Sequence, residues 1–311
     1  MKIINIHHPI KASFEQKEKI ILAMGYFDGI HKGHQKVINQ AKTIADEKGM
    51  PLGVLTYDHK PAVVYDQLSP HDKRDIILQK NKFKELEKLG VDIVFEVNYS
   101  FNFQNQSPQE FVDNYLIRFN VDTVVAGTDH TYGAKDATMD LLPKYASGRF
   151  DVVSVDLAGY HLDKISSTRI RRNLDQGHID TVNMLLGRPF RTNGTVVHGF
   201  ARGRELGYPT ANIDHDELQW LPIIGVYIVD VWIGDEKHHG MASIGRNVTF
   251  GDKNPITVEI NILDFNDNIY GEVLEIDWLH RLRGEVKFEG VEKLIEQLKS
   301  DEQMTREYFK K

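Results

Sequence analysis

Residues 25 to 34 read G-Y-F-D-G-I-H-K-G-H, directly after the apolar run 20–24. That run has the length of a buried strand, and the glycines after it let the backbone turn tightly and approach a ligand. A helix is predicted from about 33 to 48, so His31 and His34 lie where a strand leads into a helix. Because helix N-termini favour anions, this stretch predicts a nucleotide-phosphate site in an α/β fold.

The first part of the chain alternates strand-like and helix-like segments. Helices are predicted over about 73–89 and from Ser107, where S-P-Q-E reads as a capping box with proline in the first turn. Such alternation predicts a mostly parallel sheet covered by helices on both faces, with ligands beyond the carboxyl ends of the strands. The predicted strands are one at the N-terminus and then 20–24, 52–57, 91–97, 123–127 and 151–156.

The pattern changes after about Gly187. Closely spaced strands without intervening helices predict a small antiparallel barrel, followed by an amphipathic helix over about 291–309. We therefore predict an α/β domain over 1–186 and a barrel domain over 187–311. The predicted barrel strands are 194–198, 225–233, 239–245, 256–264 and 270–278.

Composition narrows the classes of function. The chain has 311 residues, of which 41% are hydrophobic and 27% charged, as expected of a globular protein with about two domains. No apolar stretch reaches the roughly 18 residues of a membrane span. A net charge of −7 without a basic run argues against a nucleic-acid partner. We therefore expect a protein that acts on small molecules. Because cysteine is absent, we expect it to be cytoplasmic; self-association is left open.

Three motifs resemble elements of one enzyme family. Residues 25–34 resemble the H-x-G-H signature of nucleotidyltransferases, in the G-x-F-D-G-x-H-x-G-H form of bacterial FAD synthetases. Residues 165–171, I-S-S-T-R-I-R, are similar to a second element of that superfamily, and 199–212, G-F-A-R-G-R-E-L-G-Y-P-T-A-N, look like the riboflavin kinase motif. In this order they resemble the bacterial bifunctional riboflavin kinase/FMN adenylyltransferase (FAD synthetase) family over essentially the whole chain.

The resemblance implies a Rossmann-like N-terminal module that adenylylates FMN. The FMN phosphate would attack the α-phosphorus of ATP, and pyrophosphate would leave, so the protein supplies orientation and charge stabilisation. By resemblance, His31, His34 and Arg171 contact the ATP phosphates, and arginine suits phosphate because its planar fork makes two hydrogen bonds. The remaining nucleotide- and flavin-binding positions of the family match Gly25, Phe27, Asp28, Gly33, Asp129, Ser167 and Thr168.

The resemblance also implies a C-terminal kinase that moves the γ-phosphate of ATP to the 5′-hydroxyl of riboflavin. Glu259 matches the family's base, which takes the hydroxyl proton. Thr210 and Asn212 match ligands of Mg²⁺ and of the nucleotide phosphates, and Mg²⁺ prefers such oxygen ligands. ATP, riboflavin, FMN and FAD are thus the expected substrates and products, with Mg²⁺ as cofactor. The other binding positions match Gly199, Arg202, Gly203, Gly207, Asn212 and Arg283.

The chain departs from the family's patterns at several positions. Lys60 stands where the family has a motif histidine. Thr128 and His130 replace aromatic residues beside Asp129, which loosens flavin packing. Val248 replaces a proline and changes the rigidity of a loop that shapes the kinase site in the family.

These departures keep alternative hypotheses open. The leading hypothesis is an enzyme with both activities. The main alternative is an FMN adenylyltransferase with a weak or silent kinase module. A third is a flavin- or nucleotide-sensing regulator that has lost turnover. Retention of His31, Arg171 and Glu259 argues against the regulator, which would need no charge-stabilising residues and should bind flavin without consuming ATP.

Overall fold

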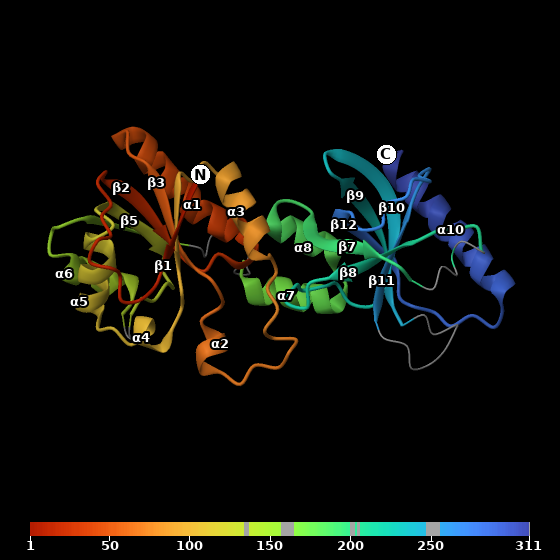
Figure 1. Ribbon diagram of the computed structural model, residues 1–311, viewed down its shortest axis with the longest axis horizontal. Helices are drawn as coiled ribbons and strands as arrows, with labels where there is room; N and C mark the ends of the chain where they lie inside the picture. The colour runs from red at the N-terminus through yellow and green to blue at the C-terminus, as the bar shows by residue number, and fades with distance from the viewer. Residues whose placement is uncertain (134–136, 157–164, 200–202, 204–205, 247–255, 311) are drawn as a thin grey trace. The chain divides into compact units, whose positions relative to one another are not determined.

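A computed structural model of the chain describes all residues except 134–136, 157–164, 200–202, 204–205, 247–255 and 311 (Figure 1). Its contacts divide the chain into two compact units, Met1–Ser167 and Thr168–Lys311. Helices α7 (Ser167–Gln176) and α8 (Ile179–Leu186) therefore fall almost wholly in the second unit. The boundary predicted at 186/187 lies further along the chain and stays a prediction.

The first unit is built on a parallel sheet of six strands in the order β1-β4-β3-β2-β5-β6. The order reverses beside β2, because β3 pairs with one edge of β2 and β5 with the other. This confirms the predicted parallel sheet, and it places the loops after β2 and β5 at the crevice where such folds bind ligands. The strands are β1 (Lys2–Ile6), β2 (Ile20–Met24), β3 (Leu52–Tyr57), β4 (Ile93–Val97), β5 (Val121–Gly127) and β6 (Asp151–Val155).

Both faces of this sheet are buried. Alternate residues of β2 enter different hydrophobic clusters: Leu22 packs into one and Ile21 into the other. Helix α1 (Lys32–Lys48) and helix α3 (Gln79–Lys88) supply one cluster, through residues such as Val37 and Leu86. The opposite cluster takes side chains from α4 (Phe101–Gln104), α5 (Pro108–Phe111), a π-helical continuation over Val112–Ile117, and α6 (Leu142–Ala146).

The helix expected over 73–89 begins only at Gln79. The backbone that precedes this helix instead contacts the first motif, because the backbone N–H groups of Ile76 and Ile77 donate hydrogen bonds to the Asp28 carboxylate. A long-range contact therefore overrides local helix propensity here. The capping box expected at Ser107 is present, with Glu110 as its partner.

The second unit contains a closed barrel in the order β10-β11-β8-β7-β12-β9, with every pairing antiparallel. The predicted barrel is confirmed, but strand β8 (Ala211–His215) was not predicted, because it begins inside the polar P-T-A-N motif. Helix α10 (Val291–Phe309) lies along the outside of the barrel (Figure 1). The other strands are β7 (Phe190–Val197), β9 (Gly225–Ile233), β10 (Glu236–Gly245), β11 (Thr257–Ile262) and β12 (Val273–Arg283).

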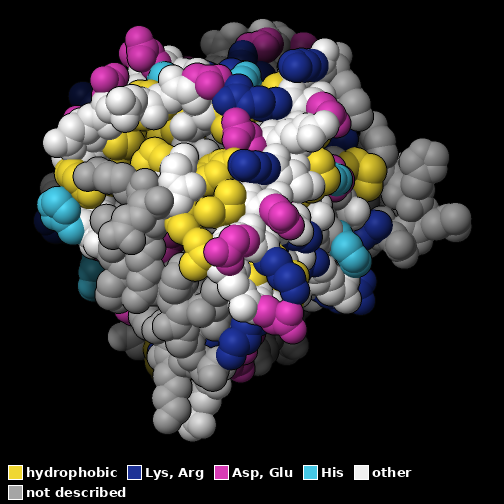
Figure 2. All heavy atoms as spheres, turned by 90° about the vertical axis from the view of Figure 1, so that its right-hand side faces the viewer, with side chains coloured by type: hydrophobic (Ala, Val, Ile, Leu, Met, Phe, Trp, Pro, Cys, Tyr) yellow, Lys and Arg dark blue, Asp and Glu magenta, His cyan; other side chains and the backbone are white. Residues whose placement is uncertain are grey.

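Acidic and basic side chains are interspersed on the face drawn in Figure 2. Ion pairs along α10, such as Arg306 with Glu302 and Lys293 with Glu289, follow the same mixed pattern. Among the residues that the structure describes, no helix has the length and apolar character to cross a membrane.

Candidate active sites

The turn between β2 and α1 is strained. Phe27 has φ 56°, Gly29 has φ 81° and Ile30 has φ 42°, so two of the three are non-glycine residues in the left-handed region. Such residues cost on the order of 1–3 kcal/mol each and persist only where the surroundings hold them. Thr56 contributes to this support, because its hydroxyl donates to the Tyr26 carbonyl at 3.0 Å.

Asp28 is the main support of the turn. Its side chain is buried, and its Oδ1 accepts hydrogen bonds from the backbone N–H of Ile76 at 2.9 Å and of Ile77 at 3.3 Å. The Ser167 hydroxyl donates to the Asp28 carbonyl at 3.0 Å, which brings the I-S-S-T segment to the same turn. The sequence placed Asp28 in the motif without assigning its partners; its contact with a cofactor stays a prediction.

His31 and His34 lie together at the N-terminus of α1. His31 is the N-cap, and its Nδ1 accepts the backbone N–H of His34 at 3.2 Å, which leaves the proton of a neutral His31 ring on Nε2. The two rings stack with centroids 3.6 Å apart. At Gly33 a Cβ would lie 3.1 Å from the His31 ring, so glycine lets the ring pack tightly there. The structure thus brings the predicted pair together at a helix N-terminus, where phosphate is favoured.

His34 is held in its neutral form. Burial lowers its pKa well below 6.5, and the neighbouring His31 and Lys82 lower it further. Its ring and that of Phe27 pack at right angles, with centroids 5.3 Å apart. Its Nδ1 is buried and has no hydrogen-bond partner among the described residues. An unsatisfied buried polar atom costs about 1–3 kcal/mol; a contact of His34 with a substrate stays a prediction.

Lys82 is a buried cation near this turn that the sequence did not single out. Lys82 is 2% exposed, and its Nζ lies 3.4 Å from the Tyr26 carbonyl oxygen and 3.3 Å from the Tyr57 carbonyl oxygen. Burial lowers its pKa to about 8, while Asp28 and other carboxylates oppose that shift. The local sequence pattern of α3 does not distinguish Lys82 from the other lysines of this helix. Its burial becomes visible only in the folded structure.

The remaining predicted positions of the first site follow β5 and begin α7. Asp129 is exposed in a turn where His130 donates its N–H to the Gly127 carbonyl at 2.9 Å. The Nε2 of His130 is buried without a described partner, and burial lowers the His130 pKa to about 4. Thr168 and Arg171 lie on α7, where the Arg171 guanidinium is 5.6 Å from the Trp220 ring centroid.

The predicted kinase residues converge in the barrel. Strands β8 and β11 pair so that Asn212 lies directly opposite Glu259. Thr210 donates its hydroxyl to Glu259 Oε2 at 3.3 Å, and Thr257 donates to Oε1 at 3.3 Å. The unpredicted strand β8 therefore brings the P-T-A-N motif to a carboxylate that lies far from it in the sequence.

Two motif glycines are required by close approach. A Cβ on Gly199 would lie 2.1 Å from the Asn212 amide, and one on Gly203 would lie 2.2 Å from the Tyr208 carbonyl. Gly207 has φ 80°, a backbone conformation that favours glycine. The predicted contacts of Arg202 and Val248 lie outside the described residues.

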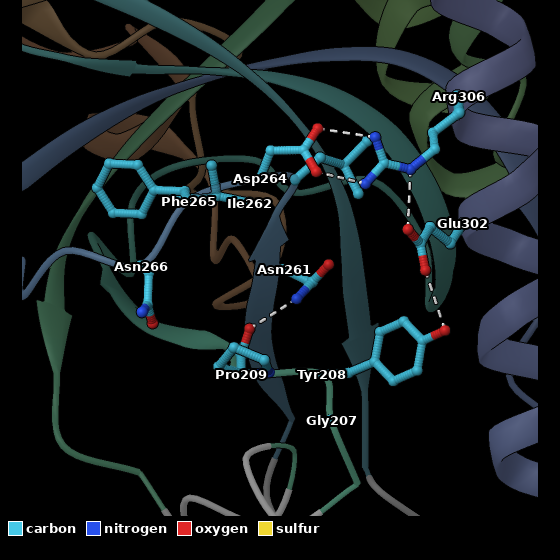
Figure 3. A pocket seen from close by; sticks show the side chains of 11 residues that line it. Gly207, Tyr208, Pro209, Asn261, Ile262, Asp264, Phe265, Asn266, Glu302 and Arg306 are labelled. Carbon is cyan, nitrogen blue, oxygen red and sulfur yellow. Dashed lines mark hydrogen bonds and ion pairs between the residues drawn. The ribbon is translucent and has the colours of Figure 1, made fainter.

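A hollow of about 280 Å³ lies at the end of β11 that follows Glu259 (Figure 3). A chain of polar contacts lines it: the Tyr208 hydroxyl donates to Glu302, Glu302 pairs with Arg306, and Arg306 binds Asp264 through both terminal nitrogens. Asn261 donates to the Pro209 carbonyl at 2.8 Å and so ties β11 to the kinase motif. This hollow was not predicted from the sequence.

Arg283 pairs with a helix carboxylate. Its guanidinium binds Asp301 of α10 with Nη2–Oδ2 at 2.7 Å, and Asp301 is fully buried. This contact anchors α10 to β12. The predicted role of Arg283 in ligand binding stays a prediction.

Comparisons with known proteins assign both halves of the chain. The family model for FAD synthetase matches residues 13–169, and the one for riboflavin kinase matches 186–309. A bifunctional riboflavin kinase/FMN adenylyltransferase of Listeria monocytogenes is 48% identical over 100% of this chain and 99% of its own. The protein of that name from Bacillus subtilis is 39% identical over 99% and 98% of the two chains.

The chain belongs to the bifunctional riboflavin kinase/FMN adenylyltransferase family. The Escherichia coli member is 30% identical and covers 99% of this chain and 98% of its own. A solved structure titled a macrolide-efflux protein from Streptococcus pneumoniae has a TM-score of 0.89 and 38% identity, covering 97% of this chain and 99% of that one. As a member of the family, this enzyme phosphorylates riboflavin to FMN and adenylylates FMN to FAD, with ATP as co-substrate.

Proposed function

We propose that the two reactions of flavin synthesis occur at the two residue clusters described above. Adenylyl transfer is assigned to His31 and His34 at the N-terminus of α1, with Ser167, Thr168 and Arg171 on the ATP phosphates. Phosphoryl transfer to riboflavin is assigned to Glu259, Thr210 and Asn212. The observation that carries the second assignment is the pairing of Asn212 opposite Glu259, with Thr210 in hydrogen-bond contact.

In the first reaction, an oxygen of the FMN phosphate forms a bond to the α-phosphorus of ATP. The bond from that phosphorus to the bridging oxygen breaks, and pyrophosphate leaves with the bonding electrons. Both nucleophile and leaving group belong to the substrates, so the protein contributes position and charge stabilisation. The Nε2–H of neutral His31 is a donor to phosphate oxygen, and the helix N-terminus adds its partial positive charge.

In the second reaction, the 5′-hydroxyl of riboflavin bonds to the γ-phosphorus of ATP. The bridging bond breaks, ADP leaves, and the hydroxyl proton passes to Glu259 as general base. The hydroxyls of Thr210 and Thr257 fix both oxygens of this carboxylate. These two hydroxyl donors orient the base.

The donors around Glu259 fit Mg²⁺. The Thr210 hydroxyl and the Asn212 amide offer oxygen, which this hard cation prefers. Within the described residues, no three His, Cys, Asp or Glu side chains form a metal cage, and Mg²⁺ in nucleotide sites is bound mainly by phosphates and water. When bound, the ion would neutralise phosphate charge. Removal of Mg²⁺ by a chelator should therefore stop both reactions, and excess Mg²⁺ should restore them.

Separation of flavins by chromatography tests the assignment. Purified protein is incubated with ATP and Mg²⁺, once with riboflavin and once with FMN. FAD from both, with FMN appearing in the riboflavin reaction, supports two working sites. FAD from FMN alone would refute the kinase assignment and return the adenylyltransferase-only alternative. We also propose a cytoplasmic location, which the lack of cysteine supports; fractionation of cells tests it.

A further inference from the structure

Lys60 stands where the sequence comparison led us to expect a motif histidine, and it is buried. The residue is 7% exposed and follows β3, in the loop that precedes α2 (Ala62–Tyr65). Its ammonium faces inward rather than toward solvent. Burial of a lysine ammonium is costly unless oxygen atoms surround it, so its partners reveal what the side chain does.

All the partners that the structure shows for the Lys60 ammonium lie in one short segment. Its Nζ donates to the carbonyl of Asp72 at 2.9 Å and to the carbonyl of Arg74, and lies 3.3 Å from Asp75 Oδ1. One ammonium thus holds a turn over residues 72–75. Lysine suits this task because it carries three donors on a flexible stem, whereas a neutral histidine has one.

The 72–75 segment held by Lys60 is followed directly by the two residues whose backbone N–H groups bind Asp28 in the motif turn. Residues 76 and 77 follow it, and their amides are the two donors to Asp28. The Ile76 side chain also packs at Gly29, where a Cβ would lie 3.0 Å from Ile76 Cγ2. Asp28 in turn lies inside the strained backbone that places His31 and His34.

We propose that Lys60 is a positioning residue for adenylyl transfer: it anchors the 72–75 turn so that the amides of Ile76 and Ile77 hold Asp28 and the histidine-bearing turn. This inference rests on the proposed function of the first site. It differs from a role as a phosphate ligand, which position 60 would suggest if its side chain pointed at the nucleotide. The lysine that replaces the family's histidine at position 60 therefore anchors the 72–75 turn inside the protein.

Kinetics of Lys60→Met and Lys60→Arg test the proposal, with riboflavin phosphorylation by the same chain as an internal control. For Lys60→Met we expect the kcat of FAD formation from FMN to fall about 10- to 100-fold, the loss that a displacement of roughly 1 Å brings. The KM for ATP should change less than about threefold, because no substrate contact is lost. Lys60→Arg keeps the donors and should retain most of the activity. Lys88→Met, an exposed lysine on α3, is the matched control.

A double-mutant cycle separates anchoring from direct contact. If Lys60 acts through Asp28, Lys60→Met should add no further loss in an Asp28→Ala background. Multiplying losses, or a rise in the KM for ATP with kcat unchanged, would overturn the proposal and make Lys60 a nucleotide ligand. Lys60→His with full activity would also overturn it. If the unchanged protein forms no FAD from FMN, the proposed function fails instead. A thermal melt of each variant checks folding, and the conservative arginine variant keeps the test decisive if the methionine variant is unstable.

Discussion

At the residue scale, His34 is kept neutral by burial and by two neighbouring cationic or ionisable groups. A neutral imidazole at a phosphate site acts as a hydrogen-bonding group, not as a fixed charge. Its Nδ1 is buried and has no hydrogen-bond partner among the described residues, and we propose that a substrate atom completes its hydrogen bonding. The role of His34 can therefore be tested with side chains that keep or remove that capacity.

We predict that His34→Ala lowers the kcat of FAD formation by about 10²- to 10³-fold, as loss of one stabilising donor does. His34→Asn, which is neutral but can hydrogen bond near the same position, should retain roughly tenfold more activity than His34→Ala. Steady-state rates of FAD formation measure this, and riboflavin phosphorylation should stay unchanged in both. Equal losses in the two variants would contradict a hydrogen-bonding role for His34.

His130 gives the fold a dependence on pH. Burial lowers its pKa from 6.5 to about 4, so the unfolded chain takes up a proton before the folded one as the pH falls. Stability from the neutral ring is present above about pH 6.5 and is lost progressively toward pH 4. We predict that His130→Phe reduces the loss of thermal stability between pH 7 and pH 5, by on the order of 1–2 kcal/mol. Melting followed by circular dichroism at both pH values checks this; an unchanged pH dependence would contradict it.

At the scale of elements, the sequence predicted what local patterns determine. Helix α1 follows its apolar period from Lys32 to Lys48, and the alternation of elements predicts the parallel sheet. Two features, strand β8 and the late start of α3, could not be predicted from the sequence, for the same reason. Strand β8 is short and polar, and it exists because it pairs with β11; α3 starts late because Ile76 and Ile77 are held by Asp28. Both depend on partners far along the chain, which no local pattern encodes.

The ion pair that attaches α10 to the barrel should contribute to the free energy of unfolding of the second unit. Arg283 and the fully buried Asp301 form a close ion pair, and removal of one member leaves the other charge buried without compensation. We predict that Arg283→Met destabilises the second unit by about 3–5 kcal/mol, whereas Arg283→Met with Asp301→Leu recovers most of this loss. Denaturation followed by tryptophan fluorescence is the measurement, because Trp220, Trp232 and Trp278 all lie in that unit. A double variant no more stable than the single one would show that the pair does more than neutralise itself.

At the scale of the whole molecule, each of the two compact units contains the central residues of one predicted active site. His31 and His34 lie in the first unit, and Thr210, Asn212 and Glu259 lie in the second. The sequence predicted this division of labour from motif order alone. It could not predict how Asp28, Lys60 and Lys82 are used, because these polar groups turn inward only when distant segments enclose them.

Because the two reactions are assigned to different sets of residues, two inactive variants should complement each other. Glu259→Gln should lower riboflavin phosphorylation by about 10²- to 10⁴-fold, as loss of a general base does, yet still form FAD from FMN. A chain with His31→Ala and His34→Ala should stop at FMN. We predict that an equal mixture converts riboflavin to FAD after a lag, since FMN released by one chain must reach the other through solution. Time courses of the three flavins, with each variant alone as control, measure this. FMN that stops at about one equivalent per kinase site, with no FAD in the mixture, while Glu259→Gln converts added FMN, would mean that the FMN made by the kinase is not released to solution.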